Sequence, residues 1–236
     1  MGKLGDLINS QPEIRRNVLR RVRQVVVVYI LIALLLFVPA GSLKWLYAWL
    51  YLAVYLLVML VGVLVLPLDL ISERGSRKEN AEKWDVSVSR LMAVFTVGIY
   101  PLAGLDFRWH WSPELATGLH VASITAFILG CALEVWAMAS NRFFSTSVRI
   151  QSDRGHTVCS SGPYRYVRHP GYVGMIIYFL ATPVFVGSLW GVIPAMATAV
   201  LFVVRTRMED RTLLQKLLGY REYAARVRFR LFPGVW

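Results

Sequence analysis

The chain has 236 residues, of which 56% are hydrophobic, and it carries a formal net charge of +12 at pH 7. Its mean hydropathy of +0.52 lies well above that of water-soluble domains of this size, which excludes an ordinary soluble protein. The two cysteines form no Cys-x-x-Cys pair and the histidines form no His-x-x-x-His pair, so nothing supports a disulfide framework or a metal site.

Six apolar runs follow one another along the chain, and the first four approach the length of about 20 residues that a membrane-crossing helix needs. The last two are shorter and are joined by Gly187 and Ser188 alone, which predicts a tight helical hairpin. We therefore expect an all-α integral membrane protein with about six membrane helices. The runs occupy residues 25–40, 45–67, 89–106, 114–139, 171–187 and 189–204.

The basic residues alternate between the connections. Of the 26 Lys and Arg residues, only Lys44 and Arg108 fall outside the N-terminal lead, the 67–90 and 140–170 loops and the region from 205 onward. Basic residues gather on the cytoplasmic side of short loops, so both termini are predicted to be cytoplasmic. The positive charge then needs anionic lipid headgroups as partners and no nucleic acid.

The basic lead, residues 1–24, is predicted to be an interfacial segment that is retained; cleavage as a signal peptide is the competing interpretation. Residues 25–110 are interpreted as a membrane-helix scaffold. The mixed charges of 67–90 predict a solvated connection. The third run is expected to end near Tyr100-Pro101, followed by an interfacial belt formed by Trp109 and Trp111.

Glu134 lies inside the fourth apolar run, where an ionisable group is costly and is by default a functional candidate. It also lies within about two helical turns of Asn141, so it has an equal claim to a place near the interface and a pair with Arg142. The sequence leaves both interpretations open.

The stretch GPYRYVRHPGYVG, residues 162–174, combines backbone flexibility, aromatic rings, guanidinium groups and an imidazole. Pro163 and Pro170 prevent it from forming one continuous helix. Its three glycines allow close approach of the backbone to a ligand. The plainer alternative is a membrane-surface turn whose arginines extend to the lipid headgroups.

Three polar pieces are predicted to converge on one cytoplasmic pocket formed by the C-terminal half: the loop from Gln151 to Ser161, the 162–174 stretch and the region from Arg205 onward. The tight hairpin between the second and third pieces requires them to lie close together. Arg205 and Glu209 are four residues apart and share a helix face, so a local ion pair between them stays an alternative.

RHPGYVG, followed by RTRMEDRTLL and GYREYAARVRFRLFPGVW, resembles the isoprenylcysteine carboxyl methyltransferase and phospholipid methyltransferase superfamily over about residues 135–236. The resemblance implies methyl transfer from S-adenosylmethionine, with S-adenosylhomocysteine as product, to a membrane-resident or lipophilic acceptor. It favours carboxyl O-methylation of an isoprenylcysteine-like substrate. Residues 111–236 would then hold further membrane helices and the cytoplasmic catalytic region, in a bacterial or archaeal inner membrane.

Other activities stay open. A phospholipid-type N-methyltransferase shares the superfamily, and membrane sterol-type reductases, which use NADPH, have a similar C-terminal helix arrangement. A small membrane scaffold or transporter would require more polar residues at mid-membrane than the chain has.

The resemblance also assigns roles by motif. Glu209 would bind the amino-acid part of the cofactor. Asp210, for its part, is expected to be exposed. Arg205 and His169 would be catalytic, and Arg205 and Glu134 would meet the acceptor. Arg205 would need an anionic acceptor as its partner, whereas an amine acceptor would need His169 or Glu134 as base. The cofactor-binding residues would be Gln151, His156, Thr157, Val158, Cys159, Tyr164, His169, Pro170, Gly171, Tyr172 and Glu209.

Overall fold

The structure is a computed structural model that describes residues 12–76 and 80–236. Regular structure in this part of the chain is entirely helical, as predicted, and the first part of the basic lead lies outside it. Six helices are long: α2 (Pro12–Ala40), α3 (Leu46–Val65), α5 (Lys83–Trp109), α6 (Thr117–Ser140), α7 (Pro170–Val186) and α8 (Val192–Lys216). Four elements are short: α4 (Leu68–Gly75), α9 (Tyr220–Arg226) and the 3₁₀ turns η1 (Ser152–Arg154) and η2 (Gly162–Arg165).

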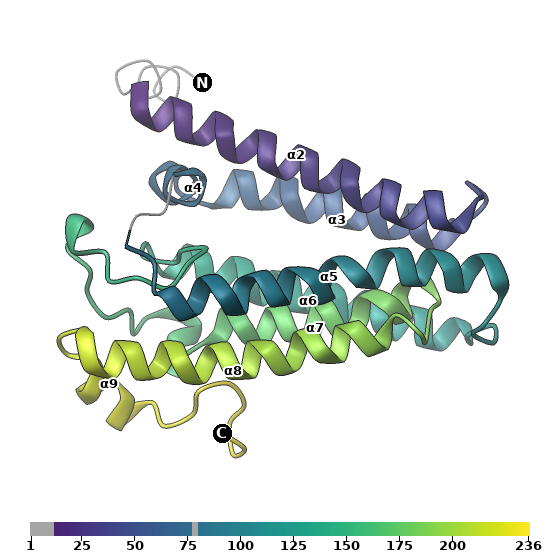
Figure 1. Cartoon of the computed structure of the whole chain (residues 1–236). Coiled ribbons are helices and arrows are strands. Elements are labelled where there is room, and N and C mark those ends of the chain that lie inside the picture. The colour runs from purple at the N-terminus through teal and green to yellow at the C-terminus, as the bar shows by residue number, and fades with distance from the viewer. Residues whose placement is uncertain (1–11, 77–79) are drawn as a thin grey trace.

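The long helices run back and forth between two ends of the molecule (Figure 1). The start of α2, helix α4, the connection after α6 and α9 lie at one end, and the short turns after α2, α5 and α7 lie at the other. Basic connections therefore share one end, as the charge pattern predicted. That this end faces the cytoplasm stays a prediction.

Four helices, α2, α3, α5 and α6, are long and apolar enough to cross a membrane. Their outward faces carry large apolar side chains such as Leu57 and Leu64, which are 61% and 85% exposed. Helices suit lipid because they satisfy their backbone hydrogen bonds internally. α7 has 17 residues, about 26 Å at 1.5 Å per residue, and α8 is apolar only in its first half, so a total of six crossings stays a prediction.

Two glycines let α6 and α7 approach each other at backbone distance. A Cβ on Gly174 would collide with the carbonyl oxygen of Gly130 and lie 2.9 Å from the amide nitrogen of Glu134. A Cβ on Gly130 would lie 2.7 Å from the Gly174 carbonyl oxygen. Gly174 therefore serves helix packing, whereas the sequence pattern had indicated close approach to a ligand.

The expected end of the third span at Tyr100-Pro101 is wrong, because α5 continues through Pro101 to Trp109. A proline removes only one donor, and its neighbours can compensate for that inside a membrane helix. The extra turns carry Asp106, which is 2% exposed and accepts hydrogen bonds from the hydroxyls of Ser112 (2.6 Å) and Ser188 (2.5 Å). This carboxylate joins two of the turns at that end.

The expected solvated connection at 67–90 is found only in part, since Asp69, Lys83 and Arg90 are exposed but the other charged residues that the structure describes there are not. It contains α4, whose Leu70 and Glu73 are buried, and it ends in α5, where Asp85 is 1% exposed. These two acids can be buried because distant residues pair with them: Arg149 lies 3.5 Å from Glu73 and Arg205 lies 2.8 Å from Asp85.

The packing of α6 on α7 makes Gly174→Ala a sharp test of the fold. Overpacking of this contact should lower the free energy of unfolding by about 1–3 kcal/mol, seen as a lower midpoint of thermal unfolding in detergent. Gly118→Ala, on the same α6, is the control, because no atom lies within 4 Å of its Cβ position. Equal midpoints for the two variants would contradict the helix contact.

Candidate functional site

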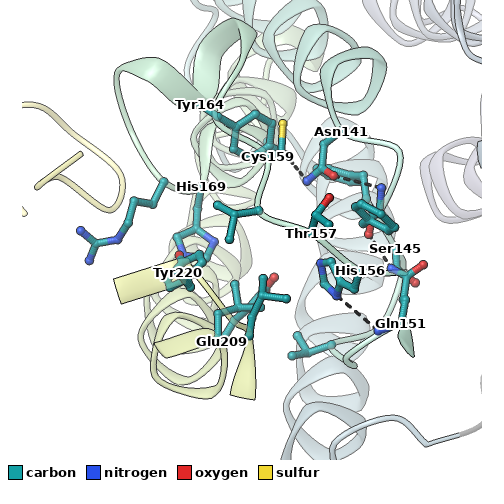
Figure 2. Close-up of a pocket in the computed structure, with 18 of the residues that line it drawn as sticks. Asn141, Ser145, Gln151, His156, Thr157, Cys159, Tyr164, His169, Glu209 and Tyr220 are labelled. Carbon is teal, nitrogen blue, oxygen red and sulfur yellow. Dashed lines mark hydrogen bonds between the residues drawn. The ribbon is translucent and has the colours of Figure 1, made fainter. Parts of the chain in front are cut away.

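A pocket opens at the basic end of the molecule (Figure 2). Its wall combines polar, charged and aromatic side chains, as small-molecule sites commonly do. All three predicted pieces contribute to its wall, and so does a fourth piece, residues 141–149, that the sequence reasoning missed. The predicted residues in the wall are Gln151, His156, Thr157, Val158, Cys159, Tyr164, His169, Gly171, Tyr172 and Glu209.

Three predicted residues do not belong to the wall. Pro170 is the first residue of α7, where a proline's missing amide is harmless and its fixed φ suits a helix start. Arg205 is buried behind Tyr172, and its guanidinium carbon lies 5.4 Å from the centre of that ring. Glu134 lies deeper, on α6.

The two prolines interrupt the 162–174 stretch as predicted. Gly162–Arg165 forms the turn η2, and α7 begins only at Pro170. Gly162 has φ +55°, and a Cβ there would collide with the Ser140 hydroxyl, so glycine is required by the turn. Gly171 lines the pocket, and a Cβ on it would lie 2.6 Å from the Phe144 ring.

One side of the pocket is formed by Gln151 and His156 (Figure 2). The Gln151 side chain is buried, and its amide donates to the Phe143 carbonyl at 2.6 Å. The Gln151 backbone N–H donates to Nδ1 of His156 at 3.2 Å. Nδ1 is therefore an acceptor, and the other ring nitrogen of the neutral imidazole is left to donate.

Burial lowers the pKa of His156 to about 4, helped by the positive charges of Arg149 and Arg154. The imidazole is therefore neutral at physiological pH. Its neutral form suits a hydrogen-bonding role in the wall better than a charged one.

Opposite His156, the Glu209 carboxylate accepts a hydrogen bond of 2.5 Å from the Tyr172 hydroxyl. The predicted proximity of α7 and α8 is thus confirmed. The alternative ion pair between Arg205 and Glu209 does not form: Arg205 donates instead to both carboxylate oxygens of Asp85, at 2.8 and 3.3 Å, and to the Thr146 carbonyl at 3.1 Å. Arg205 therefore has an anionic partner already, which removes the reason to require one from an acceptor.

Asp210 is fully buried, so the expectation that it would be exposed is wrong. Arg168 donates to both of its oxygens at 2.7 and 2.9 Å, Arg230 donates at 2.8 Å and Tyr220 at 2.9 Å. Nε2 of His169 lies 3.4 Å from the same carboxylate. Burial alone would raise the pKa of Asp210, but the hydrogen bonds from His169, Arg168 and Arg230 hold it well below its ordinary value.

The Arg168-His169 pair is also fixed through its backbone. The N–H groups of Arg168 and His169 donate to the carbonyls of Phe229 and Arg230, at 3.0 and 2.9 Å. The C-terminal tail therefore lies directly against the start of α7, and Asp210 binds the two together.

The fourth piece of the pocket wall, residues 141–149, contains two buried polar atoms that lack a hydrogen-bond partner. Among the described residues, Ser147 Oγ and Arg149 Nε are buried pocket-lining atoms without a hydrogen-bond partner. Buried polar groups are normally paired, so these two atoms are exceptions that a bound ligand would explain. The only signal in the sequence was the run of small hydroxyl residues between Ser145 and Ser147, which lies just before the predicted loop.

The pocket thus offers a carboxylate at Glu209 on one side and unpaired donors at Ser147 and Arg149, with aromatic walls at Tyr164 and Tyr172. This combination of an acid, donors and aromatic rings fits a ligand that has a zwitterionic amino-acid part and an aromatic nucleobase. S-adenosylmethionine has these groups, so the residues present fit the cofactor that the sequence resemblance implies.

The structure has four helices suited to crossing a membrane and a polar pocket at one end of them. These features are those of an integral membrane protein with a site near the membrane surface. Residues 122–215 match the model of the isoprenylcysteine carboxyl methyltransferase (ICMT) family.

The chain is also similar to two curated proteins. The chain is 31% identical over 121 residues to protein-S-isoprenylcysteine O-methyltransferase of Rattus norvegicus, which covers 49% of this chain and 42% of the rat protein. It is 34% identical over 111 residues to protein-S-isoprenylcysteine O-methyltransferase B of Arabidopsis thaliana, covering 44% of this chain and 54% of the plant protein. The matches thus span about half the length of these relatives.

The burial of Asp210 predicts that Asp210→Asn destabilises the protein strongly. Loss of the negative charge leaves Arg168 and Arg230 uncompensated, which should cost about 3–5 kcal/mol. Thermal unfolding in detergent measures the loss, with Glu222→Gln on the exposed face of α9 as control. A midpoint within a degree of the wild-type value would show that the Asp210 network is not formed.

The lowered pKa of His156 predicts a specific pH dependence. Between the ordinary value of 6.5 and about 4, the unfolded chain binds a proton that the folded chain does not. Stability should therefore fall as pH is lowered through this window, and His156→Gln should lack this component. An NMR titration of the His156 ring should show a midpoint near 4, and a midpoint near 6.5 would contradict the buried, neutral imidazole.

Proposed function

We propose that this protein transfers a methyl group from S-adenosylmethionine to a lipophilic, membrane-resident acceptor, by carboxyl O-methylation of an isoprenylcysteine-like substrate. The observation that carries the proposal is that ten of the residues assigned to the cofactor by motif line one pocket beside apolar helices. The family match over residues 122–215 and the names of the two relatives support it.

In this proposal the two ends of the cofactor's amino-acid part meet opposite walls. Glu209 pairs with the ammonium, and Ser147 and Arg149 take the carboxylate, since charge-assisted hydrogen bonds are the strong ones. The Tyr172 ring lies where it can face a sulfonium, an attraction of about 0.5–2 kcal/mol. When bound, the cofactor supplies an electrophilic methyl group on positively charged sulfur.

Arg205 and His169 act as positioning residues in this proposal. Arg205, held by Asp85, lies against Tyr172, and Tyr172 holds Glu209 through its hydroxyl. His169 directs Nε2 toward Asp210 and stacks at 5.7 Å on Tyr172. Both therefore support the wall that faces the cofactor.

A carboxylate acceptor suits this wall. It is already ionised, so it needs no general base, and catalysis reduces to alignment of nucleophile, methyl and sulfur in a water-poor pocket. An amine acceptor would need a base, and His169 already has one ring nitrogen engaged with Asp210. The arrangement favours O-methylation over phospholipid-type N-methylation.

Glu209→Gln tests the cofactor assignment. Replacing a charge-assisted partner by a neutral amide should weaken binding of S-adenosylhomocysteine about tenfold or more, measured by calorimetry in detergent. Glu222→Gln is the matched control, an exposed acid close by on α9. Binding of NADPH in place of either S-adenosyl ligand would overturn the proposal in favour of a reductase.

A further inference from the structure

Asp85 is an almost fully buried acid in the first turn of α5, and it is not part of the pocket wall. It lies before the residues that the family model matches. Its carboxylate receives hydrogen bonds from two parts of the chain. Arg205 of α8 donates to both oxygens, at 2.8 and 3.3 Å, and the backbone N–H of Val148 donates to one of them at 2.8 Å. One buried charge therefore connects α5, α8 and the 141–149 piece of the pocket wall.

The backbone on either side of Ser147 is anchored to this acid or to its partner. On one side, the N–H of Val148 donates to Asp85, and the Val148 carbonyl accepts the backbone N–H of the residue that precedes α5 at 2.9 Å. On the other side, the Thr146 carbonyl accepts a hydrogen bond from Nη2 of Arg205 at 3.1 Å. The position of Ser147 is therefore set from outside the pocket.

Ser147 lines the pocket, and its Oγ is buried without a hydrogen-bond partner among the described residues. In the proposed function this hydroxyl donates to the carboxylate of the cofactor. Ordering a loop at the moment of binding reduces affinity, because the lost conformational freedom opposes the new contacts. The anchors at Thr146 and Val148 order this piece of the wall before the ligand arrives.

The same acid supports the opposite wall through Arg205. The guanidinium carbon of Arg205 lies 5.4 Å from the centre of the Tyr172 ring, within cation–π range, and the Tyr172 hydroxyl donates to Glu209. Arg205 is 8% exposed, so its charge is stable there only with an anionic partner. Loss of the Asp85 charge would therefore displace Arg205 and remove the support of the Tyr172 ring.

We infer that Asp85 is a positioning residue for the cofactor, because it fixes the two walls that meet the two ends of the cofactor's amino-acid part. This inference rests on the proposed function. Asp85 contacts no reacting group and acts only through Val148 and Arg205, which place Ser147 and Glu209. The N-terminal half of the chain is therefore part of the binding machinery as well as a scaffold.

Asp106 provides a matched control on the same helix. It is 2% exposed and accepts hydrogen bonds from the hydroxyls of Ser112 and Ser188. It lies about 30 Å further along α5, at 1.5 Å per residue, and so at the end of the molecule opposite the pocket (Figure 1). If Asp85 served the stability of the fold alone, the loss of either acid would affect ligand binding equally.

The test measures the Kd for S-adenosylhomocysteine by calorimetry on the full chain in detergent, beside thermal unfolding of the same samples. Asp85→Asn should raise Kd at least about tenfold, and Asp106→Asn should leave it within about threefold, although both variants unfold at a lower temperature than the wild-type protein. A Kd for Asp85→Asn within about threefold of the wild-type value would overturn the inference. An equal loss of affinity in the two variants would also overturn it.

A second pair of variants keeps the charge in case Asp85→Asn does not fold. Asp85→Glu lengthens the side chain by one methylene, which shifts the carboxylate relative to Val148 and Arg205. It should raise the Kd for S-adenosylhomocysteine more than about threefold, whereas Asp106→Glu should not. The same Kd for these two variants would contradict the positioning role.

A double-mutant cycle tests the route through Ser147. Ser147→Ala alone should raise the Kd for S-adenosylhomocysteine about tenfold. The same change should matter less than about threefold in the Asp85→Asn protein, where the hydroxyl is already displaced, and should keep its full effect in the Asp106→Asn protein. Full additivity of Ser147→Ala and Asp85→Asn would overturn the inference alone. Failure of the wild-type protein to bind S-adenosylhomocysteine would refute the proposed function, and the inference with it.

Discussion

The site depends on one buried carboxylate, that of Asp210. It receives hydrogen bonds from Arg168 at the end of the loop, Tyr220 of α9 and Arg230 of the tail, and it lies against His169. A buried anion requires such partners, because an unpaired one costs several kcal/mol. Four segments of the chain are therefore held together by a single charge.

The membrane explains why such networks lie at one end of the molecule. Helices in lipid turn apolar side chains outward, so polar groups are confined to the connections and to the interior next to them. The Asp85–Arg205 pair is the deeper of the two networks. It supports Tyr172 from behind, while Asp210 supports His169, so two of the motif residues that line the pocket are each fixed by a separate buried acid.

Hydropathy and charge predicted the helices, and proline positions predicted the break before α7. The tight hairpin between the two segments predicted the proximity of Tyr172 to Glu209. These features follow from local composition or from a short connection. The sequence reasoning failed where partners are distant along the chain. In the sequence, Asp85 lies next to the charged residue Lys83, which predicts a solvated position. No neighbouring residue indicates that Asp85 is buried in an ion pair with Arg205. Asp210 likewise gains its partners only after the tail returns to the loop.

The most direct measurement of the central claim is methyl transfer from S-adenosylmethionine labelled in its methyl group to N-acetyl-S-farnesylcysteine, followed by treatment with alkali. A methyl ester releases its label as methanol under alkali, whereas a methylated amine keeps it. The account predicts label in the lipophilic product that alkali releases fully, and no label when the carboxamide of the same compound is used. Label that resists alkali, or transfer to the carboxamide, would contradict carboxyl O-methylation.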